Sequence, residues 1–315
     1  MHMTGIDNSS TAAPRKNLAE KLIAGIIAGI KKILPQSFKQ TIRRLLVTEP
    51  VVPTVDSALM ERVTDLEVQI RQLTTILQRE HNFLPPPPKH LQVRVVSAYV
   101  PEFIESGYSS VYPDLNRSLE KAGKKLENFH RILDFGCGCG RALRALSRLL
   151  PDSELFGTDI DEEAIQWLNI YHPTLGKFFV APHTPPMPVD DHMFDLVFGI
   201  SVFTHLPEDM QFQWLEELRR ITKPAGYAIL TTHGEKHYRK FDLAYLEIME
   251  KKGFFYSDFG SNYGKSISLP DFYQGTYHSH AYIRREWNKY FDVIDITALG
   301  MQNHQDVTLL QRRSE

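Results

Sequence analysis

Three glycines in the spacing G-x-G-x-G, at Gly136, Gly138 and Gly140, separate a short apolar run from a helix-like stretch. Glycine lets a backbone turn sharply and approach a ligand closely, because it has no Cβ. A helix that begins directly after such a loop adds free N–H groups and a partial positive charge. Asp134 precedes the loop, and Asp159 ends the next apolar run, where a carboxylate can accept hydrogen bonds from both hydroxyls of a ribose. These residues predict a site for a ligand that contains a ribose.

The loop differs from the dinucleotide-binding fingerprint G-x-G-x-x-G, because Arg141 stands where the third glycine is required. Cys137 and Cys139 are the only cysteines of the chain. Two cysteines so close together in a tight loop make a poor structural disulfide, which favours a reducing, cytoplasmic location. We interpret both as small residues that fill the loop rather than as nucleophiles or metal ligands.

An alternation of strands and helices from Lys89 onward must position these residues. The patterns predict strands at 131–135, 154–158, 177–180, 194–200 and 227–232, and helices at 140–150, 162–171 and 208–222. Two further strands, 290–296 and 307–311, can pair antiparallel. Such an alternation is typical of a doubly wound, mostly parallel α/β sheet.

Four stretches resemble, in order, the motifs of class I S-adenosylmethionine-dependent methyltransferases. Residues 131–141 are similar to motif I, and residues 156–159 to the acidic second motif; 194–206 resembles the fourth-strand motif, and 218–227 the helix and turn before strand five. The resemblance covers about 128–312. It implies an enzyme with a Rossmann-like sheet of seven strands, the last one antiparallel and inserted beside the fifth. It also implies S-adenosyl-L-methionine as the cofactor.

Carried over residue by residue, the resemblance places the methionine part of the cofactor against Asp134, Gly136, Gly138 and Ser201, and the ribose on Asp159. The further cofactor-binding candidates of these loops are Cys137, Gly140 and Ile160. Many relatives hold the adenine amine with an acidic residue after strand three. This chain has Ala181-Pro182-His183 there, so backbone groups or His183 would take that role.

An insertion at residues 235–290 contains 14 aromatic residues, which is 25% of the segment against 11% of the whole chain. Aromatic rings suit sugar rings or planar acceptors, although such residues can equally form the core of a small subdomain. A hydroxyl acceptor has to lose a proton, and His205, His233 and His278 are the candidate bases, in that order. No metal-ligand set of Asp, Asn and Glu occurs at the strand ends, so we expect no metal.

The acceptor class rests on a looser resemblance, in residues 201–207, 277–287 and 303–306, to methyltransferases of bacterial surface-polysaccharide pathways. It implies O-methylation of a saccharide or glycan precursor. The alternatives are a small aromatic or other natural-product acceptor and, in another class, a non-catalytic scaffold that recruits partners. Nucleic acid is not expected, because the formal net charge is −2 and the catalytic part has no basic stripe with interleaved aromatics.

The N-terminal part divides into a polar segment (1–14, expected to be disordered), basic amphipathic helices (15–47), a heptad helix (54–82) and a proline-rich linker (83–89), before the methyltransferase domain (90–315). The basic helices would either lie on an anionic membrane surface, on its cytoplasmic side, or pack against protein. The heptad seam from Leu59 to Leu77 predicts a homo-oligomer, or else a helix packed on the domain. The apolar run Leu22–Ile30 is too short to span a bilayer.

Overall fold

The computed structural model describes residues 61–73, 85–96, 100, 102–257 and 270–314. By its contacts the chain divides into two units, residues 1–66 and 67–315. The predictions for 1–14 and 15–47, and most of the predicted heptad helix, lie outside the described residues. Residues 61–73 are helical, as predicted for that part of the heptad segment. Among the described helices, none combines the length and the apolar character that crossing a membrane requires.

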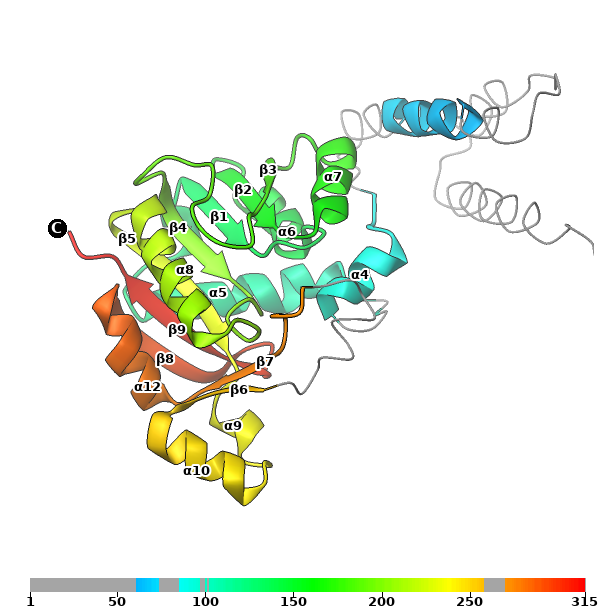
Figure 1. The fold of residues 1–315 in the computed structure, drawn as a ribbon. Helices are drawn as coiled ribbons and strands as arrows, with labels where there is room; N and C mark the ends of the chain where they lie inside the picture. Colours follow the sequence, from blue (N-terminus) through cyan, green and yellow to red (C-terminus); the bar gives the residue numbers. More distant parts are fainter. Residues whose placement is uncertain (1–60, 74–84, 97–99, 101, 258–269, 315) are drawn as a thin grey trace, which may run out of the picture. The chain divides into compact units, whose positions relative to one another are not determined.

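A seven-stranded sheet forms the centre of the second unit, with strand order β3-β2-β1-β4-β5-β9-β8 (Figure 1). Its strands are β1 (Arg131–Phe135), β2 (Glu154–Asp159), β3 (Lys177–Val180), β4 (Phe194–Gly199), β5 (Thr222–Thr232), β8 (Asp292–Met301) and β9 (Gln305–Gln311). The first five pair in parallel, and β9 runs antiparallel between β5 and β8. The predicted doubly wound methyltransferase sheet, with its inserted antiparallel strand, is confirmed.

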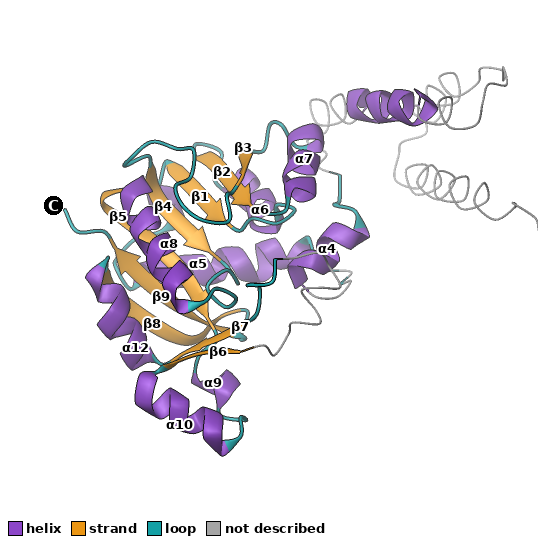
Figure 2. Ribbon diagram, viewed as in Figure 1, coloured by secondary structure: helices purple, strands orange, loops and turns teal. Residues whose placement is uncertain are grey.

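Two apolar layers bury the sheet, and the helices on each face complete them (Figure 2). On one face, α5 (Tyr112–Glu120), α6 (Arg141–Leu149) and α7 (Glu162–Tyr171) pack over side chains such as Ile132. On the other face, α8 (Glu208–Ile221) and α12 (His280–Glu286) pack over the neighbouring residue, Leu133. Successive residues of a strand point to opposite faces, so a strand covered on both sides reads as a continuous apolar run.

Strand β5 begins five residues before its predicted start at Tyr227. Thr222 pairs with Phe194 at the beginning of β4, and an irregularity in the register follows before the regular pairing of Leu196 with Tyr227. The Pro-Ala-Gly stretch at 224–226 reads as a turn in the sequence, so this early pairing was not predicted. At the other end, β8 begins at Asp292 rather than at Tyr290 and continues to Met301.

The insertion after β5 forms α9 (Glu235–Tyr238), α10 (Leu243–Lys252) and a two-stranded antiparallel sheet of β6 (Phe254–Ser257) and β7 (Gly275–His278). Figure 1 shows this small sheet beyond the end of β5, with α9 and α10 outside it. Several aromatic rings of the insertion pack on one another. Rings in such contacts belong to Phe241, Tyr245, Phe254, Phe255, Tyr277 and Tyr282. Phe259 and Tyr263 lie outside the described residues.

The proline-rich segment packs on the domain rather than acting as a free spacer. Pro87 is buried, and the Arg144 guanidinium donates a hydrogen bond of 2.6 Å to the carbonyl oxygen of Pro85. The Gln92 amide, in α4 (Lys89–Val96), donates to the carbonyl oxygen of Pro87 over 2.7 Å. The predicted boundary at residue 90 is therefore wrong for this end, because the domain already includes residues from Pro85 onward.

Candidate functional site

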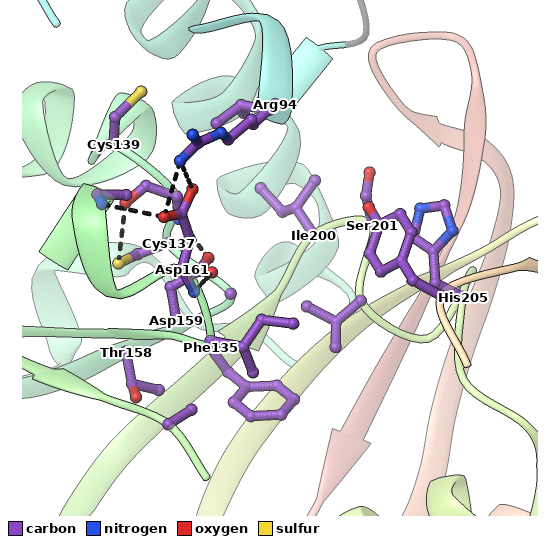
Figure 3. A pocket seen from close by; sticks show the side chains of 18 of the residues that line it. Arg94, Phe135, Cys137, Cys139, Thr158, Asp159, Asp161, Ile200, Ser201 and His205 are labelled. Atoms are coloured by element: carbon purple, nitrogen blue, oxygen red, sulfur yellow. Dashed lines mark hydrogen bonds and ion pairs between the residues drawn. The ribbon is translucent and has the colours of Figure 1, made fainter. Parts of the chain in front are cut away.

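A pocket opens at the carboxyl ends of β1, β2 and β4, and α4 contributes to its wall (Figure 3). Of the predicted site residues, those that line it are Gly136, Cys137, Gly138, Asp159, Ile160, Ser201 and His205. Asp134, Gly140, His233 and His278 do not line it. Figure 3 shows Ser201 and His205 on one side of the pocket, and Arg94, Asp159 and Asp161 on the other.

The glycine-rich loop curves around the pocket in a conformation that favours glycine. Gly136 and Gly138 have φ angles of 83° and 51°, in the left-handed region that residues with a Cβ rarely adopt. A Cβ at Gly138 would also lie 2.5 Å from a methyl carbon of Val95, in α4. The Gly138 N–H donates a hydrogen bond of 2.7 Å to Asp159 Oδ2. The loop is thus held between the second acidic motif and α4.

Two carboxyl groups, Asp134 and Asp159, lie close together at the base of this loop. Burial raises the pKa of Asp134 well above its usual range, and the neighbouring Asp159 adds to the effect. Burial also raises the pKa of Asp159, while hydrogen bonds from the N–H groups of Asp161 and Gly138 oppose the shift. A bound cation would favour the ionised form of both groups. Asp159 lines the pocket and Asp134 does not, so Asp159 is the carboxyl group of the pair that a ligand in the pocket can contact.

Arg94 and Asp161 form an ion pair at the pocket wall that the sequence analysis missed. The Arg94 Nη1 atom lies 3.0 Å from Asp161 Oδ1 and 2.9 Å from Oδ2, and its Nη2 atom lies 2.7 Å from Glu163. Asp161 also caps α7, because its carboxylate accepts a hydrogen bond from the N–H of Ala164. The capping position was readable from the sequence. The pairing with α4 was not, because it joins residues 67 positions apart.

Ser201 follows β4 in a left-handed conformation, with a φ of 62°. Its N–H donates to the hydroxyl oxygen of Thr231 over 2.8 Å, and its own hydroxyl oxygen accepts a 2.7 Å hydrogen bond from the Gln305 amide. The hydroxyl proton of Ser201 can therefore be donated to a ligand. Such a conformation is uncommon for a residue with a side chain and is frequent at binding sites.

His205 lines the pocket, and two neighbouring residues hold its ring in place. Its Nδ1 atom lies 2.8 Å from the carbonyl oxygen of Gln274, which can only accept, so Nδ1 carries the proton and Nε2 is free to receive one. The ring stacks on Tyr273, with 3.8 Å between ring centroids. Burial lowers the pKa of His205 to about 4. At neutral pH the imidazole is therefore uncharged, which is the form that a general base requires.

The structure contradicts the expectation that His278 reaches the acceptor. The His278 side chain is 0% exposed, and its Nε2–H donates to the Gln211 amide oxygen over 2.9 Å. Its ring packs against Phe254 and Trp287. Phe254, Tyr282 and Trp287, three aromatic residues of the insertion, contact this histidine in the core.

His233 lies beside the pocket, in a cluster with His237 and His304. Its ring centroid is 6.4 Å from that of His205. One ligand-type atom from each of the three side chains lies within 4.8 Å of the other two. The expectation of no metal was based on the lack of a set of Asp, Asn and Glu at the strand ends, and the three histidines form a possible set of another type. The sequence could not predict this set, because His304 lies in the turn before β9, far from β5 along the chain.

Two buried neutral histidines, His172 and His278, predict a loss of stability in acid. Burial lowers the pKa of each to about 3, and the Arg144 charge adds to the shift at His172. In the unfolded chain these groups titrate near 6.5. Below that pH the unfolded state binds protons that the folded state does not. The free energy of unfolding should fall by up to about 1.4 kcal/mol per pH unit for each histidine between pH 6.5 and their folded pKa.

Urea denaturation at several pH values between 7 and 5 measures this slope. A His278→Gln variant keeps a polar side chain but does not titrate, so its slope should be smaller by about one proton. The same change at His130, which is exposed, is the control and should leave the slope unaltered. An unfolding free energy of the parent chain that stays constant from pH 7 to 5 would contradict the prediction.

Residues 133–228 match the sequence profile of a family described as "Methyltransferase domain". Phthiotriol/phenolphthiotriol dimycocerosates methyltransferase 1 of Mycobacterium ulcerans is 29% identical over 101 residues, which are 32% of this chain and 36% of that protein. Malonyl-[acyl-carrier protein] O-methyltransferase of Halorhodospira halophila is 28% identical over 134 residues, 42% of this chain and 45% of that protein. Among solved structures, the PH0226 protein of Pyrococcus horikoshii aligns with a TM-score of 0.46 at 20% identity, covering 70% of this chain and 98% of that one.

The domain match coincides with the part of the chain that builds the pocket. It contains the glycine-rich loop, the second acidic motif, and the segment after β4 that carries Ser201 and His205. The match supports the predicted methyltransferase domain in this part of the chain. The chain spans about a third of the length of the first two curated relatives, 36% and 35%.

Proposed function

We propose that the methyltransferase domain at residues 133–228 makes this chain an O-methyltransferase, which transfers a methyl group to a hydroxyl of a saccharide or glycan precursor. The observation that carries the proposal is the placement of His205. Its Nε2 atom is free to accept a proton, and its ring lines the same pocket as the glycine-rich loop. A hydroxyl acceptor needs such a base, because it has to lose its proton as the new bond forms.

The residues of the pocket fit S-adenosylmethionine. Asp159 offers carboxylate oxygens to the ribose hydroxyls, and Ala181 and His183 line the pocket where the adenine would lie. Gly136, Gly138 and the Ser201 hydroxyl would hold the methionine part. The bound cofactor supplies an electrophilic methyl group on a sulfonium. The methyl transfer is an in-line displacement, so the chain contributes chiefly by positioning the acceptor oxygen.

His205 would receive the acceptor's hydroxyl proton at Nε2. The Gln274 carbonyl holds the other ring nitrogen, which fixes both the tautomer and the orientation of the ring. The stacked Tyr273 ring prevents the imidazole from turning over. With the pKa lowered to about 4, His205 stays able to accept a proton throughout the neutral range.

The acceptor side of the pocket offers two aromatic side chains, Phe272 and Tyr273. The ring centroids of His183 and Phe272 lie 5.7 Å apart and Tyr273 stacks on His205, so Phe272 and Tyr273 connect these two histidines along the pocket wall. Aromatic faces of this kind suit the C–H faces of a sugar ring. The looser resemblance to methyltransferases of surface-polysaccharide pathways also supports a saccharide.

A second candidate acceptor is the carboxyl group of an acyl chain. Relatives with an acyl substrate in their names favour it: the malonyl-[acyl-carrier protein] O-methyltransferase and a fatty-acid O-methyltransferase of Mycolicibacterium smegmatis, 29% identical over 101 residues. A carboxylate is already deprotonated at neutral pH and needs no base. The two acceptors therefore differ in whether His205 is required.

Cofactor labelled in its methyl group, incubated with nucleotide sugars, glycan extracts, fatty acids and phenols, tests the acceptor class. We expect label in the sugar fractions, in a form that survives mild alkali, because a methyl ether resists hydrolysis. Label released by alkali as methanol indicates a methyl ester and favours the acyl acceptor, and label only in phenols overturns both. Binding of S-adenosylhomocysteine without label in any fraction would favour the non-catalytic scaffold.

Self-association through the heptad segment remains our proposal for residues 59–77, of which 61–73 are described and helical. Leu66 and Ile70 belong to the seam, whereas Val68 lies off it and is 44% exposed. We expect Leu66→Asp with Ile70→Asp to reduce the mass in light scattering, and Val68→Asp to leave it unchanged. A parent chain that is monomeric at all concentrations would contradict oligomerisation.

Flotation with anionic vesicles tests the proposed membrane contact of residues 15–47.

A further inference from the structure

Three imidazoles meet beside the pocket, each carried by a different element. His233 directly follows β5, His237 lies in α9, and His304 lies in the turn between β8 and β9. The pairing of Thr232 with Asp306 places the end of β5 next to the beginning of β9, which brings this turn to His233. The His237 ring centroid is 4.5 Å from that of His233 and 4.7 Å from that of His304.

Two of these side chains bury a polar atom without a hydrogen bond. The Nδ1 atoms of His233 and His237 have no partner among the described residues, although a buried polar atom normally has one. In the methyl-transfer chemistry proposed above, neither side chain has a role. A ligand that accepts nitrogen lone pairs would satisfy both atoms at once.

We propose that His233, His237 and His304 form a binding site for a divalent transition-metal ion of the Zn²⁺ class. Imidazole nitrogen suits Zn²⁺, Cu²⁺ and Ni²⁺ and does not suit Mg²⁺ or Ca²⁺, which require oxygen ligands. In a tetrahedral zinc site with bonds of about 2.0–2.1 Å, ligand nitrogens lie about 3.3 Å apart. The separations of up to 4.8 Å between the candidate atoms then need to shorten by ~1.5 Å at most. His304 is exposed and can move by that amount.

The surroundings of the cluster favour a bound cation. The Asp306 carboxylate, 1% exposed, packs directly on Gly234, next to His233, where any Cβ would collide with it. Asp306 Oδ2 lies 2.7 Å from His280 Nε2, and its Oδ1 accepts a hydrogen bond from the N–H of Leu299. Asp306 thus adds negative charge near the cluster, while its own hydrogen bonds are to His280 and Leu299. The Tyr277 ring, 5.4 Å from His233, covers the cluster on another side.

Three histidines leave one position of a tetrahedral ion open. Zinc sites with three protein ligands keep that position for water or another oxygen ligand, whereas structural sites use four. The site would therefore bind its ion without being closed by the chain. The proposal concerns ion binding, and it stands whether or not the ion takes part in methyl transfer.

Metal content and calorimetry of the full chain, prepared without an affinity tag and treated with a chelator, test the site. We expect uptake of about one Zn²⁺ per chain, a higher melting temperature with Zn²⁺, and the visible absorption of tetrahedral Co²⁺ after cobalt substitution. The double variant His237→Ala/His304→Ala should lose these three signals and weaken binding by at least ~100-fold. The control variant His130→Ala, at an exposed position elsewhere, should retain them.

Since His237 and His304 are half-buried and exposed, their replacement should leave the circular dichroism spectrum unchanged. The single variant His304→Cys replaces one ligand by another that zinc accepts. It should therefore bind zinc, in contrast to the double variant. Zinc uptake by the double variant equal to that of the parent chain would overturn the proposal. The proposal is also overturned if the parent chain takes up no zinc while S-adenosylhomocysteine still binds. That result would leave the proposed methyl transfer unaffected.

Discussion

Replacing Gly138 by valine is expected to weaken binding of S-adenosylhomocysteine by at least about 100-fold, or 2.7 kcal/mol. Gly138 lines the pocket, and its φ of 51° is strained for any residue with a Cβ. The new Cβ would also lie 2.5 Å from Val95, so either α4 or the loop has to move. Movement of the loop would break the hydrogen bond from the Gly138 N–H to Asp159, which lines the same pocket.

Gly123→Val provides a matched control for this prediction. Gly123 has a similar φ of 65°, but a Cβ there would meet no atom within 4 Å, and it does not line the pocket. Both variants place a Cβ at a positive φ, but only Gly138→Val adds a collision with Val95, and only this variant should lose the ligand. Isothermal calorimetry measures the affinity, and thermal unfolding measures the stability. Equal affinities of the two variants for S-adenosylhomocysteine would refute the placement of the cofactor on this loop.

A His205→Ala variant should lower kcat by roughly 10²–10⁴-fold, the range that removal of a general base produces. The affinity for S-adenosylhomocysteine should stay within about twofold, because His205 is placed to contact the acceptor's proton rather than the cofactor. Steady-state kinetics with the acceptor found by labelling, together with calorimetry, separate the two effects. The control is His130→Ala, at an exposed position outside the pocket.

The pH profile of the parent chain gives a second readout of the same base. Because the pKa of His205 is lowered to about 4, the imidazole is uncharged above about pH 5 and becomes protonated below it. We expect kcat to be nearly constant from pH 8 to 5 and to fall as the pH approaches 4, where the acid lability of the buried histidines sets the lower limit of the measurement. A kcat that stays unchanged in His205→Ala would refute the assignment of His205 as the base.

Local patterns were sufficient for the central elements of the fold. Helix α7 and strand β3 have the predicted bounds, and β1, β2 and β4 differ by at most one residue. These strands are buried on both faces and therefore appear as continuous apolar runs, bounded by glycines and capping residues. The glycine-rich loop was equally readable, because its conformation depends on the residues of the loop itself.

Contacts between distant segments could not be predicted in this way. The early start of β5 depends on the pairing of Thr222 with Phe194, and the boundary near residue 90 depends on the contact of Pro85 with Arg144. The aromatic insertion looked like an acceptor surface, and the structure divides its rings: some pack on one another, whereas Phe272 and Tyr273 line the pocket. Composition shows that a segment is rich in aromatic residues, but it does not show which rings pack in the core and which line a pocket.

The histidines show most directly which placements the sequence could predict and which depended on the tertiary structure. The sequence determined that His205 follows a strand at the carboxyl edge of the sheet, which is enough to bring it to the pocket. Only the packing decided that His278 is enclosed in the core and that His304 meets His233 and His237. The physical reason is that strand order and chain reversal set the distances between such residues. The antiparallel insertion of β9 beside β5 decides which loop lies next to which, and no local pattern near residue 304 carries that information.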